Sequence, residues 1–277
     1  MIERDVSAPV FVRPMLAHRK PDDMPIERYA DGWVAEVKED GQRVIWMVRN
    51  HEVMAWSRPG PGKKEGLPRT LPHAVADVCR TLPDGLYDGE LTVVGGKSWD
   101  VSRKTGAGIP VLLAFDLLEA LGESTVRHQY TTRRELLETA TSKALSEHLQ
   151  LVQQVPVSTD SYRAVIARGG EGLMLKREHS IYRPGSRSKE WLKCKEEKTA
   201  VLEVVGYKEA IGGPHSCLKL RDRAGIVITV KAPPWIVAAA DQEEGLFLGK
   251  LVSVEYQTKT ESGSYRHPRF DRLLEGR

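Results

Sequence analysis

The segment of residues 33–49 constrains the fold more than any other, because two β-type patterns flank a turn within it. Residues 33–38 (Trp-Val-Ala-Glu-Val-Lys) alternate between apolar and polar positions, as a half-buried strand does. Asp40-Gly41 is a turn dipeptide, and residues 43–49 (Arg-Val-Ile-Trp-Met-Val-Arg) follow it as a second strand. The pattern predicts a hairpin in which 43–49 returns alongside 33–38, with Lys38 at the strand–turn junction.

The first two thirds of the chain mixes further strand and helix patterns. Residues 1–32 are rich in proline and charge and are expected to be irregular. Thr132 and Glu135 form a capping-box pattern that predicts a helix beginning there and running to Leu149. Short apolar or alternating runs predict strands at 53–57, 86–94, 111–118, 151–155, 172–176 and 191–195, and two other segments predict helices at 72–82 and 160–168.

The pattern changes after about residue 198. Four short β-type runs, at 201–207, 218–221, 226–231 and 251–256, are separated by glycine, proline and charged turns. Closely spaced strands of this kind are typical of a small barrel, and an oligonucleotide-binding barrel is a natural candidate. The sequence thus predicts an α+β fold with one domain over residues 1–198 and a small β-barrel domain over residues 199–277.

Charge and cysteine usage narrow the class of protein. The 277 residues carry a formal charge of only +3, but residues 176–195 hold seven basic residues against Glu178 and Glu190. A local excess of this kind suits a polyanion such as nucleic acid, although a solvated basic face gives the same composition. The three cysteines are widely spaced, and the N-terminus lacks an apolar signal region. We therefore expect a soluble cytoplasmic protein that does not enter a membrane.

Lys38 stands out as a candidate nucleophile because it begins the pattern Lys-x-Asp-Gly-x-Arg, which ends at Arg43. By itself the pattern also fits a surface lysine at the end of a hairpin. Four further segments with polar residues at strand ends follow in order: 88–90 (Asp-Gly-Glu), 115–116 (Phe-Asp), 171–176 (Glu-Gly-Leu-Met-Leu-Lys) and 191–195 (Trp-Leu-Lys-Cys-Lys).

In this order the segments resemble the motifs of the covalent nucleotidyltransferase superfamily, which comprises DNA ligases, RNA ligases and mRNA capping enzymes. The resemblance extends from Arg13 to about Arg272. Residues 13–17 (Arg-Pro-Met-Leu-Ala) and 265–270 (Tyr-Arg-His-Pro-Arg-Phe) look like flanking signatures of bacterial ATP-dependent DNA ligases of the end-joining and short stand-alone kinds. The resemblance implies an ATP-grasp-like nucleotidyltransferase (adenylation) domain followed by an OB-fold barrel.

The resemblance also implies the reaction. Lys38 would attack the α-phosphorus of ATP and form a lysyl-AMP intermediate, and AMP would then pass to the 5′-phosphate of a DNA nick. A lysine amine has a reference pKa of about 10.4, which nearby cations, burial or a metal can lower. Lys193 and Lys195 alternate with apolar residues, so both face one side of a strand, where they would neutralise the α-phosphate.

The nucleotide-binding roles are likewise implied by the resemblance. Glu36 would accept a hydrogen bond from the adenine amino group, Phe115 would stack on the base, and Glu90 would bind the ribose hydroxyls. For Phe115, a core aromatic in a buried strand is the alternative. The other residues assigned to cofactor binding are Arg43, Arg58 and Lys176, and a loop arginine in solvent is the alternative for Arg58.

The resemblance further implies a magnesium (or manganese) ion and nicked duplex DNA as partners. Glu171 and Glu90 are the expected metal ligands, since hard divalent cations prefer carboxylate oxygen. We expect a monomer that acts in DNA repair or recombination, and end-joining or repair proteins are its candidate partners. An RNA ligase, a capping-type nucleotidyltransferase and a catalytically weak nucleic-acid-binding relative are the alternatives.

The C-terminal tail departs from the pattern of this group. Such ligases usually carry an Arg-x-Asp-Lys segment there, which orients the pyrophosphate, whereas Leu274 and Gly276 occupy the arginine and aspartate positions here. The departure affects the expected efficiency of self-adenylation more than it affects the resemblance to DNA ligases.

Overall fold

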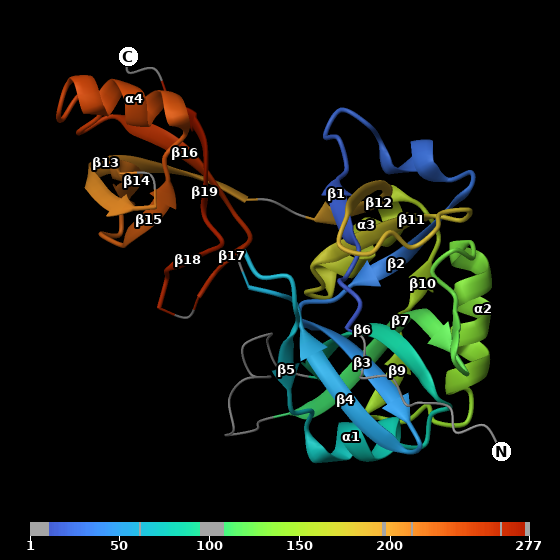
Figure 1. The fold of residues 1–277 in the computed structure, drawn as a ribbon. Coiled ribbons are helices and arrows are strands. Elements are labelled where there is room, and N and C mark those ends of the chain that lie inside the picture. The colour runs from blue at the N-terminus through green and yellow to red at the C-terminus, as the bar shows by residue number, and fades with distance from the viewer. Residues whose placement is uncertain are drawn as a thin grey trace. The chain divides into compact units, whose positions relative to one another are not determined.

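A computed structural model describes residues 11–60, 62–94, 108–195, 198–211, 213–260 and 262–274. The chain divides into two compact units, Met1–Lys195 and Glu196–Arg277 (Figure 1). Mixed sheets and helices in the first unit and a β-rich second unit confirm the α+β class. Within the described parts of the chain, no helix is long and apolar enough to cross a membrane.

The first sheet of unit 1 has one apolar and one polar face. Its spatial order is β1 (Leu16–Arg19), β12 (Arg187–Lys195), β11 (Gly172–Arg177), β2 (Trp33–Lys38) and β10 (Gln154–Val155). On the apolar face, Val37, Leu173 and Cys194 pack with Val165 of α3 (Thr159–Ala167), so this helix covers the sheet. A short 3-10 helix, η1 (Ile26–Tyr29), lies between β1 and β2 in the sequence.

The second sheet of unit 1 is covered by two helices. Its spatial order is β5 (Leu67–Arg69), β4 (Glu52–Ser57), β3 (Gln42–Arg49), β6 (Gly85–Val94), β7 (Ile109–Ala120) and β8 (Glu123–Ser124), with β9 (Leu149–Leu151) also paired to β7. Val75 of α1 (His73–Cys79) and Leu137 of α2 (Tyr130–Thr141) pack into the core on one face of this sheet.

The other face of the second sheet meets the polar face of the first. Ile45 of β3, Phe115 of β7 and Trp191 of β12 belong to one buried cluster that joins the two sheets. The rings of Phe115 and Trp191 meet edge to face, with centroids 6.5 Å apart. Charged groups on these facing surfaces are therefore held away from water.

The second unit is a curved five-stranded sheet with one helix. Its spatial order is β15 (Val227–Lys231), β14 (Gly213–Arg221), β13 (Lys198–Ala210), β16 (Leu251–Tyr256) and β19 (Arg269–Leu273). Helix α4 (Pro234–Gln242), which no sequence pattern predicted, buries Ile236 and Ala240 in the core of this unit. A small ribbon of β17 (Thr258–Lys259) and β18 (Tyr265–Arg266) completes the unit.

The predicted hairpin of 33–38 with 43–49 is wrong, although both strands form. Strand β2 pairs with β10 and β11 of the first sheet, whereas β3 pairs with β4 and β6 of the second. The cause is burial: Val44 and Trp46 enter one core cluster while Ile45 enters another, so β3 needs a central place with both faces covered. The Asp40-Gly41 segment therefore connects two sheets.

The predicted capping box at Thr132 is also wrong. Helix α2 begins at Tyr130 after Gln129, which makes no side-chain cap bond, and it ends at Thr141. Tertiary contacts set this start, because the helix must place Arg133 on the buried Asp116. Leu149 lies outside the helix and begins β9.

Two smaller differences concern strands. The expected strand at 151–155 is divided between β9 and β10, which belong to different sheets. Strand β1 lies inside the segment expected to be irregular, and it pairs in parallel with β12. Strand β1 has only four residues, and its partner lies far away in the sequence. Its apolar–polar alternation is therefore too short to be recognised.

The Asp116–Arg133 pair should be a main source of stability for unit 1. Both side chains are fully buried and form two bonds, at 2.7 and 3.0 Å. Asp116→Ala leaves an unpaired buried guanidinium and should lower the free energy of unfolding by about 3–5 kcal/mol, measured in urea. Asp77→Ala, which removes an exposed pair with Arg80, should cost at most about 1 kcal/mol. Equal losses in the two variants would contradict this assignment.

Candidate active site

The polar face of the first sheet collects the charged residues of three sequence motifs. Gly172 of β11 lies opposite both Lys38 of β2 and Lys195 of β12. Met174 lies opposite both Glu36 and Lys193, so these residues share that face because cross-strand partners point the same way. Lys176, two residues further along β11, projects from the same face.

Glycine at position 172 makes this convergence possible. Its φ is +138°, and a Cβ atom there would lie 2.0 Å from the carbonyl oxygen of Cys194. A side chain at this position would force β11 and β12 apart. The glycine in the Glu-Gly-Leu-Met-Leu-Lys segment therefore keeps Lys38 and Lys195 within reach of a common partner.

That partner is Glu171, which immediately precedes β11. Its Oε2 atom forms an ion pair with Lys38 Nζ, and its Oε1 atom lies 3.6 Å from Lys195 Nζ. The Lys38 side chain retains 22% of its exposure, so its amine is held in place yet remains accessible. We call Lys38, Glu171 and Lys195 the lysine–glutamate cluster.

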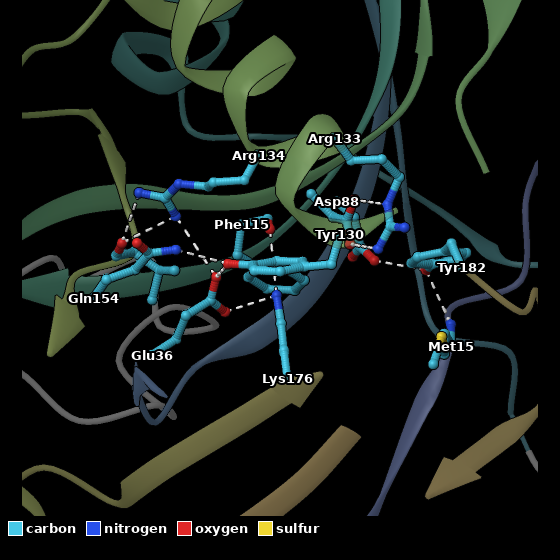
Figure 2. A network of polar contacts seen from close by, with 12 residues as sticks. Met15, Glu36, Asp88, Phe115, Tyr130, Arg133, Arg134, Gln154, Lys176 and Tyr182 are labelled. Atoms are coloured by element: carbon cyan, nitrogen blue, oxygen red, sulfur yellow. Dashed lines mark hydrogen bonds and ion pairs between the residues drawn. The ribbon is translucent and has the colours of Figure 1, made fainter. Parts of the chain in front are cut away.

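A second group surrounds Glu36, which is only 2% exposed (Figure 2). Lys176 Nζ lies 2.6 Å from Glu36 Oε2 and donates to the carbonyl oxygen of Phe115 at 3.3 Å. The same amine lies 4.6 Å from the centroid of the Phe115 ring and 4.4 Å from that of Trp191. Burial lowers the pKa of Lys176, and the Glu36 carboxylate opposes this shift.

Arg43 is bound to Asp88, a residue that was not among the predicted site residues. Its guanidinium forms two bonds with Asp88, at 2.5 and 2.6 Å, and Asp88 also accepts from the Tyr182 hydroxyl at 2.6 Å. The Arg43 Cζ atom lies 4.5 Å from the Phe115 ring centroid. Burial favours loss of the Arg43 proton, but Asp88 more than reverses this and raises its pKa. Asp88 could have been suspected, since an acid within an apolar strand needs a buried cation.

Glu90 lies beside the lysine–glutamate cluster and has a perturbed protonation equilibrium. Burial is the main cause that raises the pKa of this carboxyl to about 7, and the charge of Glu171 adds to the effect. Lys38, Arg43 and Arg58 act in the opposite direction. Gly41 allows the approach, because a Cβ there would lie 2.7 Å from Glu90 Cγ and 2.5 Å from the carbonyl oxygen of Leu91.

The remaining sequence-predicted residues occupy contrasting environments. Phe115 is 9% exposed, and its ring contacts Arg43 and Lys176. Arg58 is exposed in the loop after β4, and its positive charge acts to lower the pKa of Glu90. Lys193 is half-buried on the same strand as Lys195. Thus Arg58 is the only predicted site residue among the described ones that lies on an exposed loop.

Three further residues, which no sequence motif marked, complete the surroundings of Glu36. The Tyr130 hydroxyl donates to Glu36 Oε1, Gln154 Nε2 donates to that hydroxyl at 2.8 Å, and Arg134 Nη1 lies 3.6 Å from Glu36 Oε1. Tyr130 and Arg134 belong to α2 and Gln154 to β10, so only the fold brings them together.

The acidic residues suit a metal ion that is shared with a phosphate ligand. Within the described ranges, no three histidine, cysteine or acidic residues form a cluster that could hold a metal by themselves. Glu90 and Glu171 are close enough for their charges to interact, and a divalent cation would relieve that repulsion. Mg²⁺ commonly binds to one or two carboxylates together with substrate phosphates, and this pair of residues fits that mode.

Comparison with known proteins identifies the family. A family model described as the ATP dependent DNA ligase domain matches residues 14–195. A DNA ligase from Thermococcus fumicolans is 33% identical over 269 residues, covering 87% of this chain and 44% of that protein. A multifunctional non-homologous end joining DNA repair protein, LigD, from Mycobacterium tuberculosis is 31% identical, covering 68% of this chain and 24% of that protein. The chain thus spans less than half the length of these relatives.

Solved structures agree at the level of the fold. A protein titled Pmar-Lig_Pre. superimposes with a TM-score of 0.74 at 23% identity, over 96% of this chain and 68% of that chain. A Lig E DNA ligase does so with a TM-score of 0.69 at 18% identity, over 96% of this chain and all of that chain. The adenylation-domain and OB-fold architecture predicted from the motifs is confirmed, and the chain belongs to the ATP-dependent DNA ligase family.

Proposed function

We propose that this chain seals nicks in duplex DNA with ATP, through a covalent AMP adduct on Lys38. The observation that carries the proposal is the lysine–glutamate cluster, in which the Glu171 carboxylate lies between the accessible Lys38 amine and a second cation, Lys195. Residues 1–198 would form the adenylation domain and residues 199–277 the OB-fold domain. The division of contacts between Lys195 and Glu196 supports this assignment.

In the first step, the Lys38 amine attacks the α-phosphorus of ATP. A P–N bond forms, the P–O bond to pyrophosphate breaks, and the amine loses one proton. Glu171 fixes the position of the amine, while Lys195 and Lys193 neutralise the charge that spreads over the phosphate oxygens. The AMP then passes to the 5′-phosphate of the nick, and the 3′-hydroxyl displaces it.

The other site residues would hold the nucleotide. Glu36 and Lys176 would contact the base against the ring of Phe115, and Glu90 would bind the ribose hydroxyls. Arg43, fixed by Asp88, and Arg58 would keep the site electropositive. A magnesium or manganese ion held by Glu171 and Glu90 would supply additional charge neutralisation at the phosphates.

The DNA partner would be bound mainly through its phosphates. The basic residues between Lys176 and Lys195 are suited to sequence-independent, salt-sensitive binding. We place the protein in the cytoplasm as a monomer that acts in DNA repair or recombination. The LigD relative, titled as an end-joining repair protein, supports that context and makes end-joining factors candidate partners.

The most direct test is the transfer of label from α-labelled ATP to the protein. Lys38→Ala should reduce covalent labelling to below about 0.1% of the native level, because no other group replaces the nucleophile. Lys143→Ala, which alters an exposed lysine after α2, should label like the native chain. Labelling of Lys38→Ala at the native level would exclude Lys38 as the nucleophile.

Sealing itself is tested on a gel with nicked DNA, ATP and Mg²⁺. The expected result is conversion of the nicked strand to the full-length product, with nicked RNA converted far more slowly. Preferential labelling by GTP would favour a capping-type enzyme. Sealing of a pre-adenylated nick without labelling from ATP would place a defect in the first step. Such a defect is what the divergent C-terminal tail would produce. Residues 275–277 of that tail lie outside the described structure.

The raised pKa of Glu90 leads to a prediction about stability and pH. The folded chain binds this proton more tightly than the unfolded chain, so the stability due to Glu90 falls as pH rises from about 4.5 to about 7. Glu90→Gln resembles the neutral form and should be more stable than the native chain at pH 8, with a smaller difference at pH 5. Urea midpoints at both pH values measure this. Glu52→Gln, on the exposed surface, is the control, and identical pH dependence in native and Glu90→Gln chains would contradict the prediction.

A further inference from the structure

The carboxylate of Glu36 is surrounded by hydrogen-bond donors and cations. Lys176 lies at one oxygen, and Tyr130 and Arg134 lie at the other (Figure 2). Ammonium and guanidinium groups can only donate, so neither can accept a proton from Glu36. Of the groups around Glu36, only the Tyr130 hydroxyl can both donate and accept. It alone could therefore accept a hydrogen bond from a protonated Glu36 carboxyl group.

Gln154 fixes the direction of the Tyr130 hydroxyl. Its side-chain amide donates to the hydroxyl oxygen at 2.8 Å, so the hydroxyl proton is directed to Glu36. Burial and the charge of Glu36 raise the pKa of Tyr130, so the hydroxyl keeps its proton. The two hydrogen bonds from Gln154 to Tyr130 and from Tyr130 to Glu36 thus present the carboxylate as an acceptor only.

Helix α2 holds this pair of hydrogen bonds in a fixed position. Arg134 donates to the carbonyl oxygen of Val152 at 3.2 and 3.3 Å and to Glu138 at 2.7 Å. Arg133, the next residue toward the N-terminus, is held by Asp116. Because both arginines are anchored, Tyr130 on the first turn of α2 has a fixed position relative to Glu36.

An acceptor at this position distinguishes two classes of purine nucleotide. A 6-amino purine presents an N–H donor to a carboxylate, whereas a 6-oxo purine presents a carbonyl oxygen, which the carboxylate repels. A protonated or reoriented carboxyl group could donate to that carbonyl and would lose the distinction. We infer that Tyr130, oriented by Gln154, is a positioning residue that restricts the site to 6-amino purine nucleotides by keeping Glu36 an acceptor.

This inference rests on the proposed nucleotide site, and its test separates the two. The probes are ATP and inosine triphosphate, which differ at position 6 of the base without the extra 2-amino group of GTP. The native chain should take label from ATP at least about a hundredfold more efficiently. Tyr130→Phe keeps the ring that lies 4.9 Å from Lys176 Nζ but removes the donor, and it should lower the ATP-to-inosine preference about tenfold.

Gln154→Glu provides a second variant. Gln154 is exposed, so the fold tolerates a charged side chain there. The new carboxylate accepts the Tyr130 proton and turns the hydroxyl away from Glu36, so the preference should fall in the same direction. Tyr182→Phe is the matched control: it also removes a buried tyrosine hydroxyl, but one that donates to Asp88. It should leave the ratio of the two nucleotides unchanged even if both rates fall.

A binding measurement gives a readout that does not require the reaction. Calorimetric titration of the Lys38→Ala chain with each nucleotide should show the same preference, and addition of Tyr130→Phe should reduce it. Absence of labelling from ATP in the native chain would count against the proposed function, while the titrations would still test the inference. Two outcomes would overturn the inference about Tyr130. One is an unchanged preference in Tyr130→Phe and Gln154→Glu, and the other is a native chain that accepts both nucleotides equally.

Discussion

The site depends on one constraint: charges buried where the two sheets of unit 1 face each other are paired, each within its own sheet. Glu36 with Lys176, and Asp88 with Arg43, lie where water is largely absent. An unpaired charge there would be strongly destabilising, so each member requires its partner. The pairs thereby fix the side chains that surround Phe115 before any ligand arrives, which is the kind of preorganisation that phosphoryl and nucleotidyl transfer requires.

Close backbone approach is the second requirement. Gly172 lets β11 and β12 approach, and Gly41 lets the connection between the sheets pass next to Glu90. Each glycine lies in a motif beside a charged residue that it helps to place. The glycines of these motifs are thus explained by contact distances: a methyl group at either position would push the neighbouring backbone, and the charged side chain with it, away from the site.

Sequence patterns predicted the elements of the fold better than their partners. Strands β2, β3 and β6 lie where alternation placed them, but β2 and β3 do not pair. Alternation reports which side chains share a face and says nothing about which sheet a strand joins. The start of α2 was missed for a related reason, since the buried contact of Arg133 outweighs the local preference of Thr132.

The sequence by itself determined the family and the residues that its motifs contain, because motif residues are close in sequence and recur in a fixed order. It also determined that Lys38, Lys193 and Lys195 would lie on strands. Only the tertiary structure decided that Glu171 lies between two of these lysines and that Asp88 binds Arg43. It alone brought Tyr130 and Gln154 to Glu36, because contacts between residues far apart in the chain depend on sheet order and register, which local patterns do not encode.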